Sequence, residues 1–369
     1  MTITIFLYDL MFQGNKLSKK NILLILLIIG IFVKFFIEAI MNKITPMMVN
    51  RFIYYMMWGG TATLMGLYLS KNNRYKNIIN FLDILLILIN IALVRSVSYS
   101  LINNTRVSLG GATYQNAGYV FALGFGINLF YLMYGHKYNR FSFTKTIAYK
   151  LFSSSFLLVQ LYGVIATGAR GAMLLVIFYI IVILFLSLKN LKTIAKLSLL
   201  ILAFSFFIYI SWPVISEVPL VSNSWNRAFA YIGVDGIDWG GTSGRDAVYN
   251  KALETIAVKP ISGYGLFSYF NFTSFPHNIF LEVLLQGGII FLTVFLIILI
   301  SILYKFYRII RINKLFLIYT IIFSYPFIML MFSGSYISNG LFWFMMSYIY
   351  SIDLKNVREI EYTTLNYFY

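Results

Sequence analysis

Alternating charge along a series of apolar segments is the strongest constraint in this sequence. About ten segments stay apolar over the roughly 20 residues that a membrane-spanning helix needs, and 19 of the 29 Lys and Arg residues cluster in every second connection between them. Because Lys and Arg collect on the cytoplasmic face of a bilayer, this pattern predicts a multi-pass membrane protein with both termini in the cytoplasm. The predicted spans are 21–40, 51–70, 78–100, 117–135, 151–168, 172–188, 197–214, 277–304, 315–334 and 341–353.

The composition agrees with lipid as the solvent. Hydrophobic residues make up 60% of the chain and charged residues 11%, and the mean hydropathy is +0.80. A soluble domain of this composition would expose most of its apolar surface to water. The net charge of +17 is explained by cytoplasmic loops that face anionic headgroups, so we expect no nucleic-acid partner. We therefore predict an all-α integral membrane protein of roughly 10 to 12 helices, with residues 1–369 in a single polytopic domain.

One predicted external connection, residues 215–276, is far longer than the others. Short connections are the norm, so a long one indicates function. Within it, Ser243-Gly-Arg-Asp246 is typical of a capped helix start, and Pro260 and the glycines that follow end the helix. We expect an amphipathic helix on the outer membrane face, with Arg245 in its first turn. Its apolar residues have helical spacing and are Ala247, Val248, Ala252, Leu253 and Ile256.

Arginines are rare on the predicted outer side, which makes them candidates for binding. Arg106, Arg170, Arg227 and Arg245 all lie there. A planar guanidinium binds phosphate through two parallel hydrogen bonds and stays charged at a bilayer boundary, and Arg245 adds the free N–H groups of a helix start. Two ordinary interpretations stay open at this point: Arg245 could pair with Asp246, and Arg170 could extend to the headgroups.

His277 is one of two histidines in the chain and follows a proline at the predicted outer end of a span. A neutral imidazole can take a proton from a hydroxyl group near neutral pH, although a histidine at a helix start is more often a capping group. Glu282, five residues later, faces another side of the helix. We expect it to pair with Asn278 at i,i+4 or to orient other groups. A second i,i+4 pair, Lys34 with Glu38, lies inside the first span.

The sequence offers little for a metal or another cofactor, and we expect neither. Without cysteine, a disulfide, a thiolate nucleophile and a Cys-ligated metal are all excluded. Hard divalent cations need several converging carboxylates. The acids on the predicted outer side are few: Glu217, Asp235, Asp238, Asp246 and Glu254, with Glu282 just inside a span.

The ordered set of outer motifs resembles the O-antigen ligase and polymerase superfamily. The matching elements are Gly244-Arg245, Pro260-Ile-Ser-Gly263-Tyr-Gly265, His277-Asn278-Ile-Phe-Leu281-Glu282 and Gly287-Gly288, preceded by Thr167-Gly-Ala-Arg170-Gly171 and by a loop with Arg106, Gly110 and Asn116. Phe291 departs from the ligase pattern, which has Gly, Thr or Tyr there. The resemblance implies a metal-independent, inverting glycosyltransferase of the GT-C class that uses a glycan on undecaprenyl diphosphate.

By that resemblance, Arg170 and Arg245 hold the donor diphosphate, and His277 acts as the general base on the acceptor hydroxyl or orients it. Substrate-binding roles would fall to Arg106, Arg227, Asn278 and Glu282. The favoured hypothesis is a Wzy-type polymerase of O-antigen or capsule repeat units in the bacterial inner membrane, with its active site on the outer face. A chain-length regulator and a flippase would be its partners. A ligase acting on lipid A core is the alternative within this class, and a flippase or other transporter is the alternative outside it.

Overall fold

A computed structural model describes residues 19–41, 44–70, 75–103, 113–134, 146–187 and 245–355, together with short pieces within 105–109 and 191–237 and Val357. These residues are helical apart from loops and one ladder of two-residue strands, β1 (Ile232–Gly233) and β2 (Gly236–Ile237), in which Ile232 pairs with Ile237. The chain divides into two compact units. Unit 1 comprises 1–78, 242–317 and 330–369, and unit 2 comprises 79–241 and 318–329.

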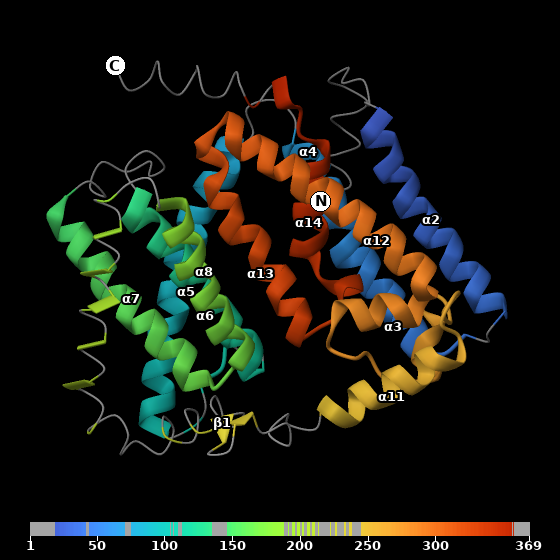
Figure 1. The fold of residues 1–369 in the computed structure, drawn as a ribbon, viewed down its shortest axis with the longest axis horizontal. Helices are drawn as coiled ribbons and strands as arrows, with labels where there is room; N and C mark the ends of the chain where they lie inside the picture. Colours follow the sequence, from blue (N-terminus) through green and yellow to red (C-terminus); the bar gives the residue numbers. More distant parts are fainter. Residues whose placement is uncertain are drawn as a thin grey trace. The chain divides into compact units, whose positions relative to one another are not determined.

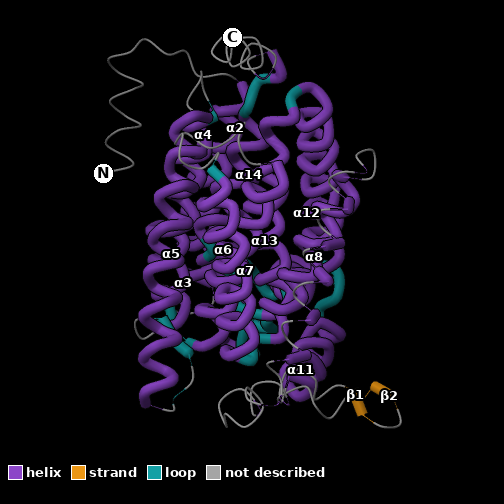
Figure 2. Tube along the Cα trace, turned by 90° about the vertical axis from the view of Figure 1, so that its left-hand side faces the viewer, coloured by secondary structure: helices purple, strands orange, loops and turns teal. Residues whose placement is uncertain are grey.

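Unit 1 contains the helices that surround the candidate site (Figure 1). Its elements are α2 (Lys19–Met41), α3 (Pro46–Tyr54), the π-helical turn η1 (Tyr55–Gly60), α4 (Thr61–Leu69), α11 (Arg245–Val258), the 3₁₀ turn η5 (Ser268–Asn271), α12 (Ile279–Ile312), η6 (Lys314–Leu317), η7 (Tyr336–Ser338) and α14 (Gly340–Ser351). Figure 2 shows α11 at one end of this unit. The elements that meet at this end are α11, η5, η7 and the start of α12.

Unit 2 contains α5 (Tyr75–Asn103, except its first turn), α6 (Tyr114–Tyr134), α7 (Ile147–Thr167), α8 (Arg170–Ser187) and most of α13 (Ile318–Phe332). Its centre is α6, which is buried over almost its whole length. Small residues allow neighbours to approach it closely. A Cβ on Gly118 would lie 2.6 Å from the Thr167 hydroxyl oxygen and 2.7 Å from the Ala169 Cβ. These contacts bring α6 against the turn between α7 and α8.

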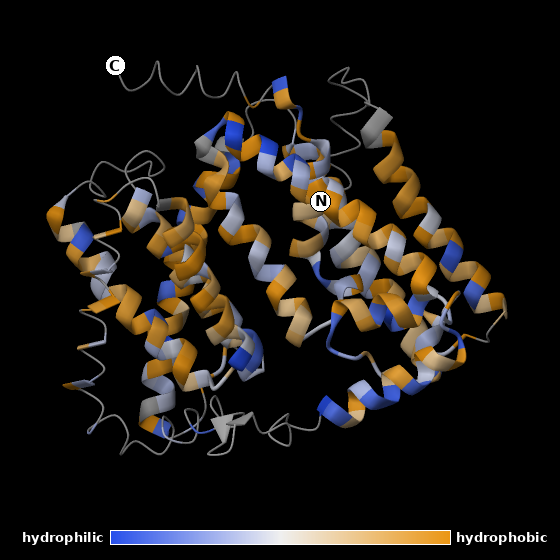
Figure 3. Cartoon of the chain, in the orientation of Figure 1, coloured by the Kyte–Doolittle hydropathy of each residue, from blue (hydrophilic) through white to orange (hydrophobic). Residues whose placement is uncertain are grey.

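The described helices agree with a membrane environment. Five of them are long and apolar enough to cross a bilayer: Ile22–Met41, Asn77–Ser100, Tyr114–Tyr134, Lys150–Thr167 and Ile279–Ile312. Figure 3 shows apolar residues along α2 and α12, and large side chains on both helices are exposed, as lipid-facing positions require. Further helices cover the predicted spans 51–70, 172–188, 315–334 and 341–353. The span 197–214 lies mostly outside the described residues, so ten spans and one polytopic domain stay predictions.

The helix at the predicted span 277–304 runs from Ile279 to Ile312 and is interrupted. The helix α12 is broken at Gly287 and Gly288, where the backbone leaves helical geometry, with φ 60° and ψ −158° at Gly288. Such a backbone is accessible essentially only to glycine. The break frees backbone N–H and C=O groups in the middle of an apolar helix, and they must find other partners.

Candidate active site at the start of α12

The loop after α11 supplies those partners. The N–H groups of Tyr264 and Gly265 donate to the carbonyl oxygens of Leu285 (2.9 Å) and Gln286 (2.8 Å), on one side of the break. On the other side, Ile289 N–H donates to the Pro260 carbonyl at 2.8 Å. The loop and the broken helix therefore satisfy each other's backbone groups.

The two backbones fit because glycine stands where they meet. A Cβ on Gly288 would lie 2.3 Å from backbone atoms of Ile261, and a Cβ on Gly263 would lie 2.5 Å from the Gly287 nitrogen. Gly263 and Gly265 also have positive φ, at 62° and 106°. The sequence predicted correctly that α11 ends before these glycines. Their second role, close approach to α12, has no signal in the sequence alone.

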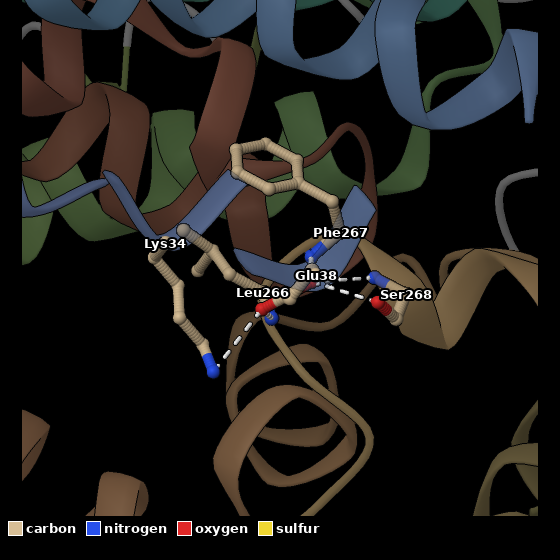
Figure 4. Close-up of polar contacts among 5 residues, drawn as sticks. All are labelled: Lys34, Glu38, Leu266, Phe267 and Ser268. Atoms are coloured by element: carbon tan, nitrogen blue, oxygen red, sulfur yellow. Dashed lines mark hydrogen bonds and ion pairs between the residues drawn. The ribbon is translucent and has the colours of Figure 1, made fainter. Parts of the chain in front are cut away.

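A carboxylate from α2 holds the next part of this loop (Figure 4). Glu38 accepts hydrogen bonds from the backbone N–H groups of three consecutive residues, Leu266 (2.5 Å), Phe267 (2.8 Å) and Ser268 (2.9 Å), and from the Ser268 hydroxyl (2.9 Å). Glu38 is buried, and its ion pair with Lys34 at 3.6 Å confirms the predicted i,i+4 pair. Its main partners are nevertheless the loop amides, which the sequence does not indicate.

A second buried carboxylate, Glu282, joins two more segments at this end of unit 1. It accepts hydrogen bonds from the Tyr269 hydroxyl (2.8 Å), the Ser335 hydroxyl (2.5 Å) and the Tyr336 N–H (3.3 Å). Burial, followed by the nearby Glu282, raises the pKa of Tyr269, which keeps its hydroxyl a donor. The network ties η5 and η7 to the start of α12.

The expected pairing of Glu282 with Asn278 is therefore wrong. The Asn278 side chain caps α12 instead, because its Oδ1 accepts from the N–H groups of Phe280 (3.0 Å) and Leu281 (3.3 Å). The free N–H groups at the helix start need an acceptor, and the Asn278 Oδ1 supplies it, whereas Glu282 already accepts from three donors. Both side chains are occupied by the protein, and any contact of theirs with substrate stays a prediction.

His277 stands just before this cap, so the capping role belongs to its neighbour. Its backbone has φ 54°, the one positive value outside glycine among the residues described, and its ring lies 4.3 Å from the Phe275 ring between centroids. Nδ1 is buried without a hydrogen-bond partner. Burial and, after it, the charge of Arg245 hold the pKa of His277 below its ordinary value of 6.5. The imidazole is therefore neutral at pH 7, as a general base must be.

Arg245 begins α11, as predicted, and its charge reaches His277 although 32 residues separate them in sequence. The structure contains no ion pair between Arg245 and Asp246, two residues that it describes, so that interpretation is excluded. The expected apolar face is only partly correct. Ala252 is buried and Val248 and Ile256 are partly buried, whereas Ala247 and Leu253 are exposed.

Arg170 begins α8 in unit 2, after a tight turn. Gly168 ends α7 with φ 63°, and its N–H donates to the Ile165 carbonyl at 2.8 Å. The Thr167 hydroxyl then accepts from Ala169 N–H at 3.3 Å. This turn places the arginine at a helix start, where free N–H groups attract anions. Arg170 and His277 belong to different units, so their convergence stays a prediction.

Comparison with known proteins bears on these same residues. The family model for the O-antigen ligase domain matches residues 155–296, a segment that includes Arg170, Arg245, His277 and the break in α12. The match supports the O-antigen ligase and polymerase superfamily for this segment. Members are glycosyltransferase-like enzymes that act on O-antigen, in a membrane and with lipid-linked sugars. No curated protein and no solved structure matches the chain.

The predicted roles of Arg106 and Arg227 and the predicted metal independence involve residues that the structure does not fully describe. Arg106 and Arg227 lie outside the described residues, as do Asp235 and Asp238. Within the described part, no group of three or more His, Asp or Glu residues could hold a metal ion. Metal independence and the roles of Arg106 and Arg227 stay predictions.

Proposed function

We propose that the protein is a Wzy-type polymerase of lipid-linked oligosaccharide repeat units. The observation that carries the proposal is the neutral His277, with a buried and unpartnered Nδ1, next to the charge of Arg245 in a segment of O-antigen ligase type. A base beside a cation suits glycosyl transfer from a diphosphate, because the reaction removes a proton from one group while negative charge develops on another.

In the proposed reaction, the acceptor hydroxyl oxygen attacks the anomeric carbon of the donor glycan. A new C–O bond forms, the bond from that carbon to the diphosphate oxygen breaks, and the hydroxyl proton passes to His277. Undecaprenyl diphosphate leaves with the bonding electrons. Arg245 and Arg170 stabilise its charge, since a guanidinium forms bidentate contacts with phosphate oxygens.

The proposed setting is the outer face of the bacterial inner membrane, with both termini in the cytoplasm. The charge alternation supports this orientation, because the reverse one would place 19 basic residues on the wrong side. Cysteine labelling in intact cells tests it. Lys145→Cys is expected to be protected from an impermeant reagent and Asp238→Cys to be labelled. Labelling of Lys145→Cys would refute the orientation.

The decisive experiment is His277→Ala in cells and with purified protein. Loss of the base is expected to slow glycosyl transfer by about 10²- to 10⁴-fold while leaving donor binding largely intact. In a polymerase, cells would ligate single repeat units and lack long chains. A normal ladder of chain lengths would refute the role of His277.

The ligase is the second candidate, because the matching family model describes an O-antigen ligase. The same variant separates the two. A defective ligase would accumulate long lipid-linked polymer with none transferred to lipid A core. A defective flippase would retain unpolymerised units on the cytoplasmic leaflet, so this phenotype would point to transport.

A further inference from the structure

The side chain of Arg51 lies against two aromatic rings and has no role in the proposed reaction. It lies in the last turn of α3, and its guanidinium carbon is 5.1 Å from the centre of the Phe270 ring and 5.0 Å from that of Phe275. Its side chain is half-buried and, among the residues that the structure describes, makes no hydrogen bond and no ion pair. Two aromatic contacts and no acceptor are an unusual combination for a group with five N–H donors.

The aromatic contacts explain how the guanidinium is held without an acceptor. Rings attract the flat faces of a guanidinium, and such contacts leave its N–H groups, which point outward in its plane, for another partner. The nearby acid, Glu282, does not serve as that partner, because its oxygens accept from Tyr269, Ser335 and Tyr336. The structure therefore presents a half-buried cation that lies against two aromatic rings and whose donors have no acceptor among the described residues.

The position of Arg51 relates it to the candidate base. The Phe275 ring that contacts the Arg51 guanidinium also packs against the ring of His277, with 4.3 Å between the centroids. Arg51 and His277 thus contact the same aromatic side chain, although they come from α3 and from the residue before the α12 cap. Arg245, from α11, is the cation whose charge reaches His277.

We propose that Arg51 binds a phosphate oxyanion beside His277, so that Arg51 and Arg245 form a two-arginine phosphate site within unit 1. Resting on the proposed function, the assignment gives this site the diphosphate of the lipid-linked donor. A phospholipid headgroup offers the same chemistry. A rigid guanidinium suits either, because it forms two parallel hydrogen bonds to adjacent phosphate oxygens.

Binding of undecaprenyl diphosphate to full-length protein in phosphatidylcholine nanodiscs tests the site. Loss of a charge-assisted contact in Arg51→Gln is expected to weaken binding about 10- to 100-fold. Arg51→Lys keeps the positive charge near Glu282 but lacks the planar guanidinium that donates two parallel hydrogen bonds, so we expect a smaller loss of binding than in Arg51→Gln. Lys259→Gln is the matched control, because Lys259 also lies over an aromatic ring, that of Tyr264 at 5.0 Å, and its variant should bind normally.

Native mass spectrometry of the same variants separates the two sources of phosphate. If only the retention of phosphatidylglycerol from mixed nanodiscs falls in Arg51→Gln, the phosphate site stands and its ligand is a headgroup. If neither ligand binds more weakly in Arg51→Gln or Arg51→Lys, with both variants folded, the proposal is refuted. Should Arg51→Gln fail to fold, Arg51→Lys alone decides, because unchanged binding in it would refute bidentate recognition.

The measurement is independent of glycosyl transfer. Wild-type protein that binds undecaprenyl diphosphate through Arg51 but transfers no glycan would refute the proposed function and leave this site in place. If the protein transfers glycan but Arg51→Gln leaves donor binding unchanged, the proposed function stands and the Arg51 site is refuted.

Discussion

Replacing Glu38 with alanine would remove the acceptor that holds the loop before η5. The carboxylate accepts four hydrogen bonds from Leu266, Phe267 and Ser268, three of them from consecutive backbone N–H groups. All four are charge-assisted and largely shielded from water. In Glu38→Ala these donors would stay inside the protein without an acceptor unless the loop moves away from α2.

The magnitude follows from the burial of the carboxylate. A hydrogen bond to a charged group contributes about 1.5–3 kcal/mol, but the cost of taking Glu38 out of water offsets part of the sum. Removal of the carboxylate leaves buried donors without an acceptor, at a cost of about 1–3 kcal/mol each, and because the loop can relax in part we expect a total loss of about 3–5 kcal/mol. Lys34→Ala is the matched control. Its side chain is 51% exposed, and an exposed ion pair contributes only about 0–1 kcal/mol.

Hydrogen exchange of peptides that cover residues 263–270 is the appropriate assay. A local loss of 3–5 kcal/mol would speed exchange of these amides by roughly 10²- to 10⁴-fold, whereas peptides from α14 should be unchanged. Glu38→Gln keeps one acceptor oxygen and should fall between alanine and wild type. Equal protection of the segment in Glu38→Ala and Lys34→Ala would refute the reasoning, because it would mean that the loop does not depend on the carboxylate.

Three other outcomes are expected. Gly288→Ala should lower stability by about 3 kcal/mol or more in thermal unfolding, since φ is 60° and a Cβ would meet backbone at 2.3 Å; Gly30→Ala, with nothing within 4 Å, should not. Because the pKa of His277 is lowered, the pH at which glycosyl transfer falls to half should lie below 6.5. Arg245→Gln should raise that pKa and move the midpoint to higher pH. Arg170→Lys should be nearly as inactive in glycosyl transfer as Arg170→Ala, because an ammonium cannot donate two parallel hydrogen bonds to phosphate as a guanidinium does.

Helices are the part of this protein that local sequence predicts well. Each described span coincides with an apolar segment, and the start of α11 at Arg245 and its end before Pro260 follow from residues within a few positions. Hydrophobicity and helix-end chemistry depend on neighbours in the chain, so they can be read without a tertiary structure. The identity of Arg170, Arg245 and His277 as candidates likewise came from residue type and predicted side of the membrane.

The partners of those residues could not be predicted in this way. Glu38 was expected to face Lys34, four residues away, and it does, but its principal contacts are amides about 230 residues later. Glu282 was expected to pair with Asn278 or to orient other groups, and it joins Tyr269 and Ser335 rather than Asn278. A buried carboxylate takes the donors that the fold brings to it, and sequence spacing identifies only those on its own helix.

From the sequence alone we predict a multi-pass helical membrane protein, and we identify a few residues on the predicted outer side that could bind phosphate and transfer a proton, because lipid imposes strict rules on apolar length and charge. The break of α12 at Gly287 and Gly288, and the loop after α11 that occupies it, are known only from the three-dimensional structure. The same holds for the contact of Arg51 with the Phe275 ring, which also packs against His277. These features depend on close approach of segments far apart in the chain, and no local pattern encodes such an approach.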